Sequence, residues 1–329
     1  MDKLLISRKY LCQLLNVSLS GLWRKLKKYD QELSEAGIKV PLQIARILTK
    51  QGIARHNIAT KKSQCFFNFK GGTGKTTLTY NISALFYLLG YKILVIDCDP
   101  QAHLTKCFIE PNNQENLSIF DVLCKSQEIN KVILSIMPEF DLIPANVKLS
   151  FVDSQIVNEV RREEILKSLV DPIRDQYDFI FFDVNPSLSV LNRNVIVACD
   201  YVNIVCEAQP FSLAGMEMLL QEFNQLARIS KDSKVNYNVI VNKFEPNLLS
   251  NLEVINVLRE TKELETNIFE NIIRKCDDFN FSSKNRIPVP FIVNKNTSNA
   301  KHDIMHLAKE LLQKSCEANK YSQGGNRAS

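Results

Sequence analysis

The chain has 329 residues, of which 45% are hydrophobic and 23% charged, and a formal net charge of +5. This composition excludes an intrinsically disordered protein and allows a large buried core in one or two domains. No apolar run approaches the length that crosses a bilayer, so we expect no membrane-spanning segment. The nine cysteines form no C-x-x-C pair, which favours free thiols in a cytoplasmic protein over a cysteine metal site.

The positive charge is concentrated at the start of the chain. Residues 1–64 hold 13 Lys and Arg against 4 Asp and Glu, a net of +9, which leaves −4 for the remainder. Ser7 and Ser18 each precede an apolar pattern of helical spacing, which is typical of serine N-caps. We therefore expect two short helices on either side of a tight turn at residues 16–18, the arrangement of a helix-turn-helix.

The second of these helices is expected to face DNA. Its apolar side chains are predicted to point inward, and these are Leu19, Leu22, Trp23 and Leu26. Its basic side chains are predicted to point outward, and these are Arg24, Lys25, Lys27 and Lys28. A basic face favours contact with DNA phosphates, although a solvated face has the same pattern. With a further helix at residues 41–52 and a linker at 54–62, residues 1–60 are predicted to form a small all-α DNA-binding domain.

The most specific motif is a glycine-rich turn at residues 70–77, with the sequence Lys-Gly-Gly-Thr-Gly-Lys-Thr-Thr. Glycines let backbone N–H groups point at phosphate oxygens, and the helix that follows adds its positive N-terminal end. We expect Lys75 to reach the β- and γ-phosphates of a nucleoside triphosphate and the Thr76 hydroxyl to bind Mg²⁺. The loop is unusual because Phe69 stands where glycine is expected and Lys70 adds a charge. The candidate nucleotide-binding residues of the loop are Lys70, Gly71, Gly72, Thr73, Gly74, Lys75, Thr76 and Thr77.

Three aspartates follow two predicted buried strands. Asp97 and Asp99 stand at the end of an apolar run, and Asp183 ends another. Ligands of open α/β sheets collect at the carboxyl ends of the strands, where one carboxylate could support Mg²⁺ and another could orient water. Taken alone, each aspartate cluster would also suit solvated or helix-capping residues. A magnesium site is indicated because both clusters occur together with the glycine-rich turn.

These motifs resemble the ParA/MinD ATPases, and most closely the ParA partition proteins that carry an N-terminal helix-turn-helix extension. The resemblance covers roughly residues 63–316 and rests on the glycine-rich turn, on Asp-Cys-Asp-Pro-Gln-Ala-His-Leu-Thr at 97–105, and on segments at 141–145, 177–183 and 209–215. It implies a P-loop NTPase fold with a doubly wound, mostly parallel sheet over residues 61–318. It also implies ATP and Mg²⁺ as cofactors.

The resemblance further implies roles for single residues. Lys70 matches the signature lysine that crosses a dimer interface to the partner's nucleotide, and Asp99 matches the aspartate that positions the attacking water. Asp97 and Asp183 match acids that support magnesium, and Asn242 resembles a base-contacting asparagine. The expected catalytic residues are thus Lys70, Lys75 and Asp99, and the expected metal site is Thr76, Asp97 and Asp183.

One departure lies after Asp183, where the family usually has Asp-x-Pro-Pro and this chain has Asn185 before Pro186. The asparagine is expected to leave this second switch loop less rigid. Arg274 and Lys275 are candidates for a second DNA surface.

The α/β alternation continues to the end of the chain. The remaining helices are predicted at residues 77–89, 156–170, 213–229, 252–265 and 299–318, and the remaining strands at 201–206 and 237–241. The last helix is expected to pack on the sheet rather than bind a membrane, and residues 319–329 are expected to form a disordered tail.

The predicted function is ATP-dependent partition of DNA. ATP would close a homodimer that binds nucleoid DNA nonspecifically, and a ParB-like partner would stimulate hydrolysis. The N-terminal domain would bind an operator and repress the protein's own operon. Two alternatives stay open: a MinD-like or secretion-accessory positioning ATPase, and a DNA-binding regulator that uses ATP only as a switch.

Overall fold

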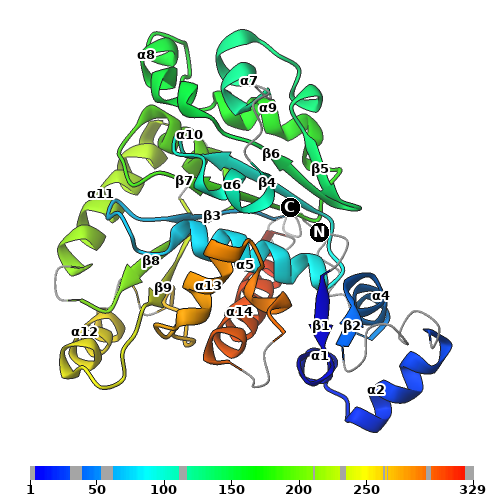
Figure 1. Cartoon of the computed structure of the whole chain (residues 1–329). Helices are drawn as coiled ribbons and strands as arrows, with labels where there is room; N and C mark the ends of the chain where they lie inside the picture. Colours follow the sequence, from blue (N-terminus) through cyan, green and yellow to red (C-terminus); the bar gives the residue numbers. More distant parts are fainter. Residues whose placement is uncertain are drawn as a thin grey trace, which may run out of the picture.

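Figure 1 shows a computed structural model of the chain, in which a large α/β body carries a smaller N-terminal unit on one side. The structure describes residues 4–29, 39–52, 62–110, 117–209, 212–229, 235–261, 264, 266–293 and 298–322. The predicted linker at 54–62 lies outside these residues except for Lys62, which begins a strand of the body.

The body is built on a seven-stranded sheet with the order β5-β6-β4-β7-β3-β8-β9. Every neighbouring pair is parallel except β5 with β6. The strands are β3 (Lys62–Phe67), β4 (Ile93–Cys98), β5 (Leu134–Met137), β6 (Phe140–Ile143), β7 (Phe179–Val184), β8 (Tyr201–Glu207) and β9 (Tyr237–Asn242). The central strands read as continuous apolar runs because both faces of a parallel sheet are covered. The predicted doubly wound, mostly parallel sheet is confirmed.

Side chains alternate between two hydrophobic cores, one on each face of the sheet. Phe66 and Phe181 belong to the first core, and their neighbours Phe67 and Phe182 belong to the second. The helices of the body that contribute to the first core are α5 (Lys75–Leu88), α6 (His103–Phe108), α13 (Asp277–Asn285) and α14 (Asn299–Ser322). Those of the second are α7 (Ile119–Lys125), α8 (Val152–Ile156), α9 (Ile165–Arg174), α10 (Val190–Ala198), α11 (Ser212–Ile229) and α12 (Leu249–Glu260). Short 3-10 turns occupy η2 (Ile129–Lys131), η3 (Val147–Phe151) and η4 (Val289–Phe291).

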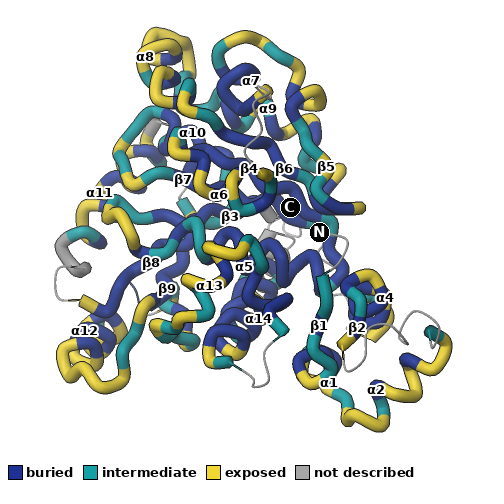
Figure 2. The backbone as a smooth tube through the Cα atoms, in the orientation of Figure 1, coloured by how far each residue is buried: buried dark blue, intermediate teal, exposed yellow. Residues whose placement is uncertain are grey.

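Helix α5 lies at the centre of the first core and is buried along nearly its whole length, as the dark tube in Figure 2 shows. It ends at Gly90, whose φ of 98° is a left-handed conformation that favours glycine and stops a helix. Helix α14 packs against α5, with Ile304 and Leu307 fully buried in the same core, which confirms the predicted packing of the last helix. None of the described helices is long and apolar enough to cross a membrane.

The N-terminal unit follows the predicted helix-turn-helix closely. Its elements are β1 (Leu5–Ser7), α1 (Arg8–Leu15), α2 (Leu19–Leu26), η1 (Lys27–Tyr29), β2 (Lys39–Pro41) and α4 (Leu42–Gly52). Ser7 Oγ accepts a hydrogen bond from Tyr10 N at 3.1 Å, and Ser18 Oγ accepts one from Gly21 N at 3.1 Å, so both predicted caps are confirmed. The unit is not all-α, because β1 and β2 pair antiparallel.

The N-terminal unit shares the first core with the body instead of standing apart from it. Buried residues of α1 and α4 form one continuous cluster with those of α5. Arg46 of α4 donates from Nε to Tyr87 O (2.9 Å) and from Nη2 to Tyr91 O (3.1 Å), and its Nη1 lies 2.5 Å from Glu139. Lys50 contacts the same carboxylate at 2.6 Å. The C-terminal end of α5 is therefore the surface on which the unit is held.

Three local predictions were wrong. Leu19 and Trp23 are 57% and 48% exposed, because only Leu22 and Leu26 of α2 reach the core, and Trp23 instead lies under the guanidinium of Arg8 at 4.5 Å. The helix predicted at 156–170 is split into α8 and α9 by turns that contain Arg161 with a φ of 57°. Helix α14 continues to Ser322, so residues 319–322 are helical, and the rest of the predicted tail lies outside the described residues.

Candidate nucleotide site

The sheet brings the three predicted motifs together at the carboxyl ends of three neighbouring strands. Asp183 of β7 lies between two neighbouring strands. Its register partner in β4 is Asp97, and its register partner in β3 is Phe66. The glycine-rich loop leaves β3 directly after Phe67 and leads into α5 at Lys75. The expected site therefore forms around one sheet edge, as the topology of an open α/β sheet requires.

The loop has the shape of a phosphate cradle. Gly72 and Gly74 have φ angles of 77° and 98°, which side chains rarely adopt. A Cβ at Gly72 would meet no atom within 4 Å, whereas a Cβ at Gly74 would lie 2.3 Å from Asn242 Nδ2. The Thr73 hydroxyl is buried without a hydrogen-bond partner among the described residues. Gly72 therefore leaves open space where a side chain would project, and Gly74 allows the Asn242 side chain to pack directly against the loop.

Lys75 is buried at the start of α5 and donates from Nζ to Lys70 O at 3.1 Å. Burial lowers the pKa of Lys75, while the carboxylates of Asp183 and Asp99 act in the opposite direction. An ammonium in this position can move from a backbone carbonyl to a phosphate oxygen without leaving the loop.

Asp97 organises the loop that carries Asp99. Its Oδ1 accepts from Asp99 N at 3.0 Å, and its Oδ2 accepts from Thr105 N at 2.8 Å and from Thr105 Oγ1 at 2.7 Å. Burial raises the pKa of Asp97 to about 6, although these bonds act to lower it. Asp99 Oδ1 accepts from Gln101 N at 2.9 Å. Thr105 was not among the predicted site residues, although it belongs to the same segment.

Asp183 is the acid best placed to take a ligand. Its Oδ1 is 3.4 Å from the Thr79 hydroxyl, and its buried Oδ2 has no hydrogen-bond partner among the described residues. Burial raises the pKa of Asp183 well above its ordinary value, and the Asp97 charge raises it further. A buried carboxylate oxygen without a hydrogen-bond donor suits a hard divalent cation. The positive charge of the cation would offset both the burial of Asp183 and the repulsion from Asp97.

The loop after Asp183 is tied together by side-chain amides. Asn192 Nδ2 donates to Asn185 O (2.9 Å), Asn185 Oδ1 (2.8 Å) and Ser187 O (2.7 Å), and Ser187 Oγ donates to Asn185 Oδ1 (2.5 Å). Asn185 thus makes contacts that a proline side chain could not make. The segment was expected to be less rigid because Asn185 stands in place of a proline. In the structure, hydrogen bonds of the Asn185, Ser187 and Asn192 side chains tie the segment together.

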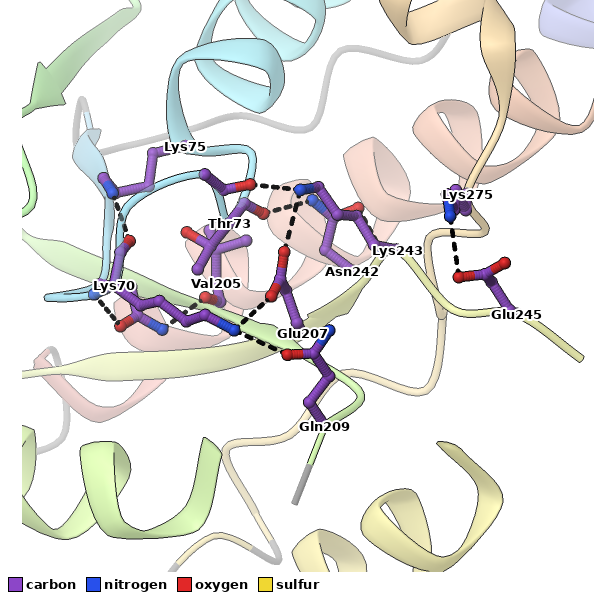
Figure 3. Close-up of polar contacts among 12 residues, drawn as sticks. Lys70, Thr73, Lys75, Val205, Glu207, Gln209, Asn242, Lys243, Glu245 and Lys275 are labelled. Carbon is purple, nitrogen blue, oxygen red and sulfur yellow. Dashed lines mark hydrogen bonds and ion pairs between the residues drawn. The ribbon is translucent and has the colours of Figure 1, made fainter. Parts of the chain in front are cut away.

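Asn242 and its neighbour Lys243 reach the loop from the end of β9 (Figure 3). Asn242 Nδ2 donates to Thr73 O at 2.7 Å. Lys243, which has a φ of 55°, donates from Nζ to Gly72 O and to Glu207 Oε1, the latter at 2.9 Å. Lys243 was not among the predicted site residues, although a lysine directly after Asn242, at the carboxyl end of a strand, could have been predicted to lie near the phosphate loop.

Lys70, which the resemblance assigns to a dimer interface, makes its side-chain contacts within the chain. Lys70 Nζ donates to Glu207 Oε2 and to Gln209 Oε1, both at 2.7 Å (Figure 3). Beside this contact lies a cavity of about 320 Å³, whose walls come from the glycine-rich loop, the 186–188 segment and α11. Glu207 was not predicted, although it is a carboxylate at the end of an apolar strand, the same pattern that identified Asp97 and Asp183.

The basic residues predicted to contact DNA differ in their surroundings. All four cations of the 24–28 segment are exposed, as expected. The Arg274 guanidinium pairs with the buried Asp303 through Nε at 3.0 Å and Nη2 at 2.5 Å, so its predicted DNA contact would have to be made beside this ion pair. That charge is committed to holding α14. Lys275 is exposed and pairs with Glu245 at 3.0 Å.

Comparisons with known proteins agree with this geometry. Residues 61–241 match a family model described as "AAA domain". The chain is 31% identical to the cell division protein PomZ of Myxococcus xanthus over 76% of this chain and 78% of that one. It is 37% identical to the chromosome-partitioning ATPase Soj of Treponema pallidum over 49% and 62% of the two chains. A solved plasmid partition protein of Borrelia burgdorferi, bound to AMPPNP, has a TM-score of 0.65 at 23% identity, covering 78% of this chain and all of that one.

Proposed function

Because this chain belongs to the ParA/MinD family of P-loop ATPases, we propose that it is an ATP-dependent DNA partition protein. The observation that carries the proposal is the joint presence, at one sheet edge, of a second lysine in the phosphate loop and the three carboxylates of Asp97, Asp99 and Asp183. Relatives named for chromosome and plasmid partition support it.

The chain's own residues fit Mg²⁺ and ATP. Backbone N–H groups of the glycine-rich loop and Lys75 would hold the phosphates, and the resemblance assigns a contact with the nucleobase to Asn242. The Thr76 hydroxyl and the free oxygen of Asp183 would hold Mg²⁺, with Asp97 fixing the loop around them. Bound Mg²⁺ neutralises charge on the phosphate oxygens. Asp99 would orient the attacking water, and a single carboxylate does so weakly, so turnover should be slow without a partner.

The proposed cycle couples nucleotide binding to association. Two ATP-loaded chains close face to face, and each Lys70 neutralises charge in its partner's site. The closed homodimer binds nucleoid DNA through phosphate contacts, so its affinity should fall steeply with salt. Lys275 is a candidate for such contacts. A ParB-like protein stimulates hydrolysis, which opens the dimer and releases DNA in the cytoplasm.

The N-terminal unit adds a second mode of DNA binding. Arg24, Lys25, Lys27 and Lys28 lie on the exposed side of α2 and η1, which is the position of the recognition helix in a helix-turn-helix. We propose that this surface binds an operator and represses the protein's own operon. Deleting the unit would uncover the core around α5, so surface substitutions are the better test.

The deciding experiment measures mass in solution by light scattering with Mg²⁺ and either ADP or a nonhydrolysable ATP analogue. We expect a monomer with ADP and a dimer with the analogue, and salt-sensitive binding of random-sequence DNA by the dimer alone. An unchanged mass in both nucleotides would refute the proposal. Replacing Lys25 and Lys28 by serine should abolish operator footprints and leave this dimerisation intact.

A positioning ATPase for another cargo is the main alternative, and it is favoured by the relative named as a cell division protein. Both functions would use the same site and dimer. They differ in cargo, so a DNA-binding partner encoded beside this chain, which stimulates its turnover on one DNA sequence, would favour partition. A regulator that uses ATP only as a switch would bind the operator with ATP but show no stimulated turnover.

A further inference from the structure

Glu207 is a buried carboxylate at the carboxyl end of β8 that holds two lysines beside the phosphate loop (Figure 3). Its side chain is only 9% exposed, with Oε2 at 2.7 Å from Lys70 Nζ and Oε1 at 2.9 Å from Lys243 Nζ. Burial acts to raise the pKa of Glu207, but the two lysines outweigh burial and keep it below its ordinary value. The carboxylate is therefore charged at neutral pH.

The start of the loop is bound to its own subunit by backbone as well as side chain. Asn68 Oδ1 accepts from Lys70 N at 2.9 Å, and Asn68 Nδ2 donates to Val205 O at 2.7 Å. Gln209 Oε1 takes a second hydrogen bond from Lys70 Nζ at 2.7 Å. Two of the three N–H donors of this ammonium are thus engaged by acceptors of the same chain. A contact of this ammonium with a phosphate on another subunit would therefore compete with these two acceptors.

The pairing with Lys243 makes release of Lys70 feasible. A buried carboxylate left without a partner is strongly destabilising. Glu207 would keep Lys243 when Lys70 leaves, so its charge would remain compensated. The Lys70 side chain is 50% exposed at the edge of the 320 Å³ cavity, so it needs no rearrangement of the core to swing outward.

We propose that Glu207 is a positioning residue that holds Lys70 in its own subunit until the dimer closes. This latch, formed by Glu207 with Lys70 and Lys243, rests on the proposed nucleotide-dependent dimerisation. Closure exchanges the Glu207–Lys70 ion pair for a contact between Lys70 and the partner's nucleotide. The latch therefore opposes association of chains that offer no triphosphate to receive the lysine, and it sets the protein concentration at which ATP-loaded chains dimerise.

The first test compares the wild type with Glu207→Gln in light scattering, with the nonhydrolysable ATP analogue and Mg²⁺. We expect the protein concentration at half-dimerisation to fall about ten- to hundredfold, because closure opens two latches and each ion pair with an exposed and a buried partner accounts for a factor of about three to ten. Gln209→Ala should shift it in the same direction by less. Glu222→Gln is the matched control, because Glu222 is also 9% exposed and pairs with Arg193 at 2.7 Å, and it should change nothing.

Measuring the affinity of Glu207→Gln for ADP distinguishes two explanations. In one, the substitution acts by releasing Lys70, and in the other it acts by removing a negative charge near the nucleotide phosphates. We expect ADP to bind Glu207→Gln and wild type within about twofold, since ADP binding does not require Lys70 to move. An unchanged midpoint of dimerisation, or an ADP affinity that rises by the same factor as dimerisation, would overturn the proposal.

A second measurement uses the nucleotide-free protein and does not depend on dimerisation. Acetic anhydride labelling followed by mass spectrometry should modify Lys70 severalfold more slowly than the exposed Lys25 in the wild type, and Glu207→Gln should reduce that difference. Equal labelling of the two lysines in the wild type would refute the latch. If Glu207→Gln frees Lys70 but no variant dimerises with the ATP analogue, the ion pair stands while the proposed function fails, and the role of Glu207 in closure fails with it.

Discussion

Replacing Arg46 by methionine should detach the N-terminal unit from the ATPase body. Arg46 is 9% exposed and donates to Tyr87 O and Tyr91 O at the end of α5. Each of these two carbonyls would lose the hydrogen bond from Arg46, at about 1 kcal/mol each, while Tyr87 O keeps the one from Gly90 N. The ion pair with Glu139 adds less than about 1 kcal/mol, because that side chain is 42% exposed and keeps Lys50. Methionine retains most of the packing over the Tyr87 ring, so we expect a loss of about 2 to 3 kcal/mol.

Urea denaturation gives the total loss, and amide hydrogen exchange shows where it occurs. The amides of α4 should exchange faster in Arg46→Met, while those of the central strands keep their protection relative to global unfolding. Arg259→Met serves as the control, since the Arg259 guanidinium makes one exposed hydrogen bond of 3.4 Å to Glu270 O. If Arg46→Met costs no more than this control and α4 stays protected, the polar contacts do not hold the unit and the shared hydrophobic core alone does.

Three substitutions test the site itself. Lys75→Ala should weaken ATP binding by more than about 100-fold, measured by calorimetry, because it removes the charge that meets the phosphates; near-wild-type affinity would contradict the assignment of the loop. Asp99→Ala should retain dimers with ATP and stop phosphate release, so unchanged turnover would remove Asp99 from its role. Gly74→Ala should destabilise the fold by about 1 to 3 kcal/mol in urea, since its Cβ would meet Asn242 in a left-handed conformation; a fully stable variant would show that the loop shifts freely.

The sheet and the position of the nucleotide site were predictable because their causes are local. A buried strand, a turn rich in glycine and a capped helix each leave a pattern within about ten residues, and parallel strands necessarily gather their carboxyl ends. The serine caps of α1 and α2 are equally local and were predicted to the residue.

Contacts between residues distant in the chain could not be predicted in this way. The fate of Arg274 depends on Asp303, 29 residues away, and no charge pattern around Arg274 reveals that contact. Trp23 fits the apolar periodicity of α2, but only Leu22 and Leu26 of this helix are buried, and the Trp23 ring lies against Arg8 instead. The contact between Lys70 and Glu207 joins residues that are 137 positions apart, at the ends of the neighbouring strands β3 and β8, so it could be found only in the folded chain.

The continuous core beneath α4 and α5 has a consequence for how the protein could measure DNA. A domain on a loose tether adapts to many spacings between half-sites, whereas α2 here packs on the same continuous hydrophobic core as α5, the helix that follows the phosphate loop. In a closed dimer the two α2 helices would therefore be held at one fixed separation. Inserting about 5 base pairs, half a turn of the duplex, between two operator half-sites should then abolish cooperative binding even though every base contact is kept.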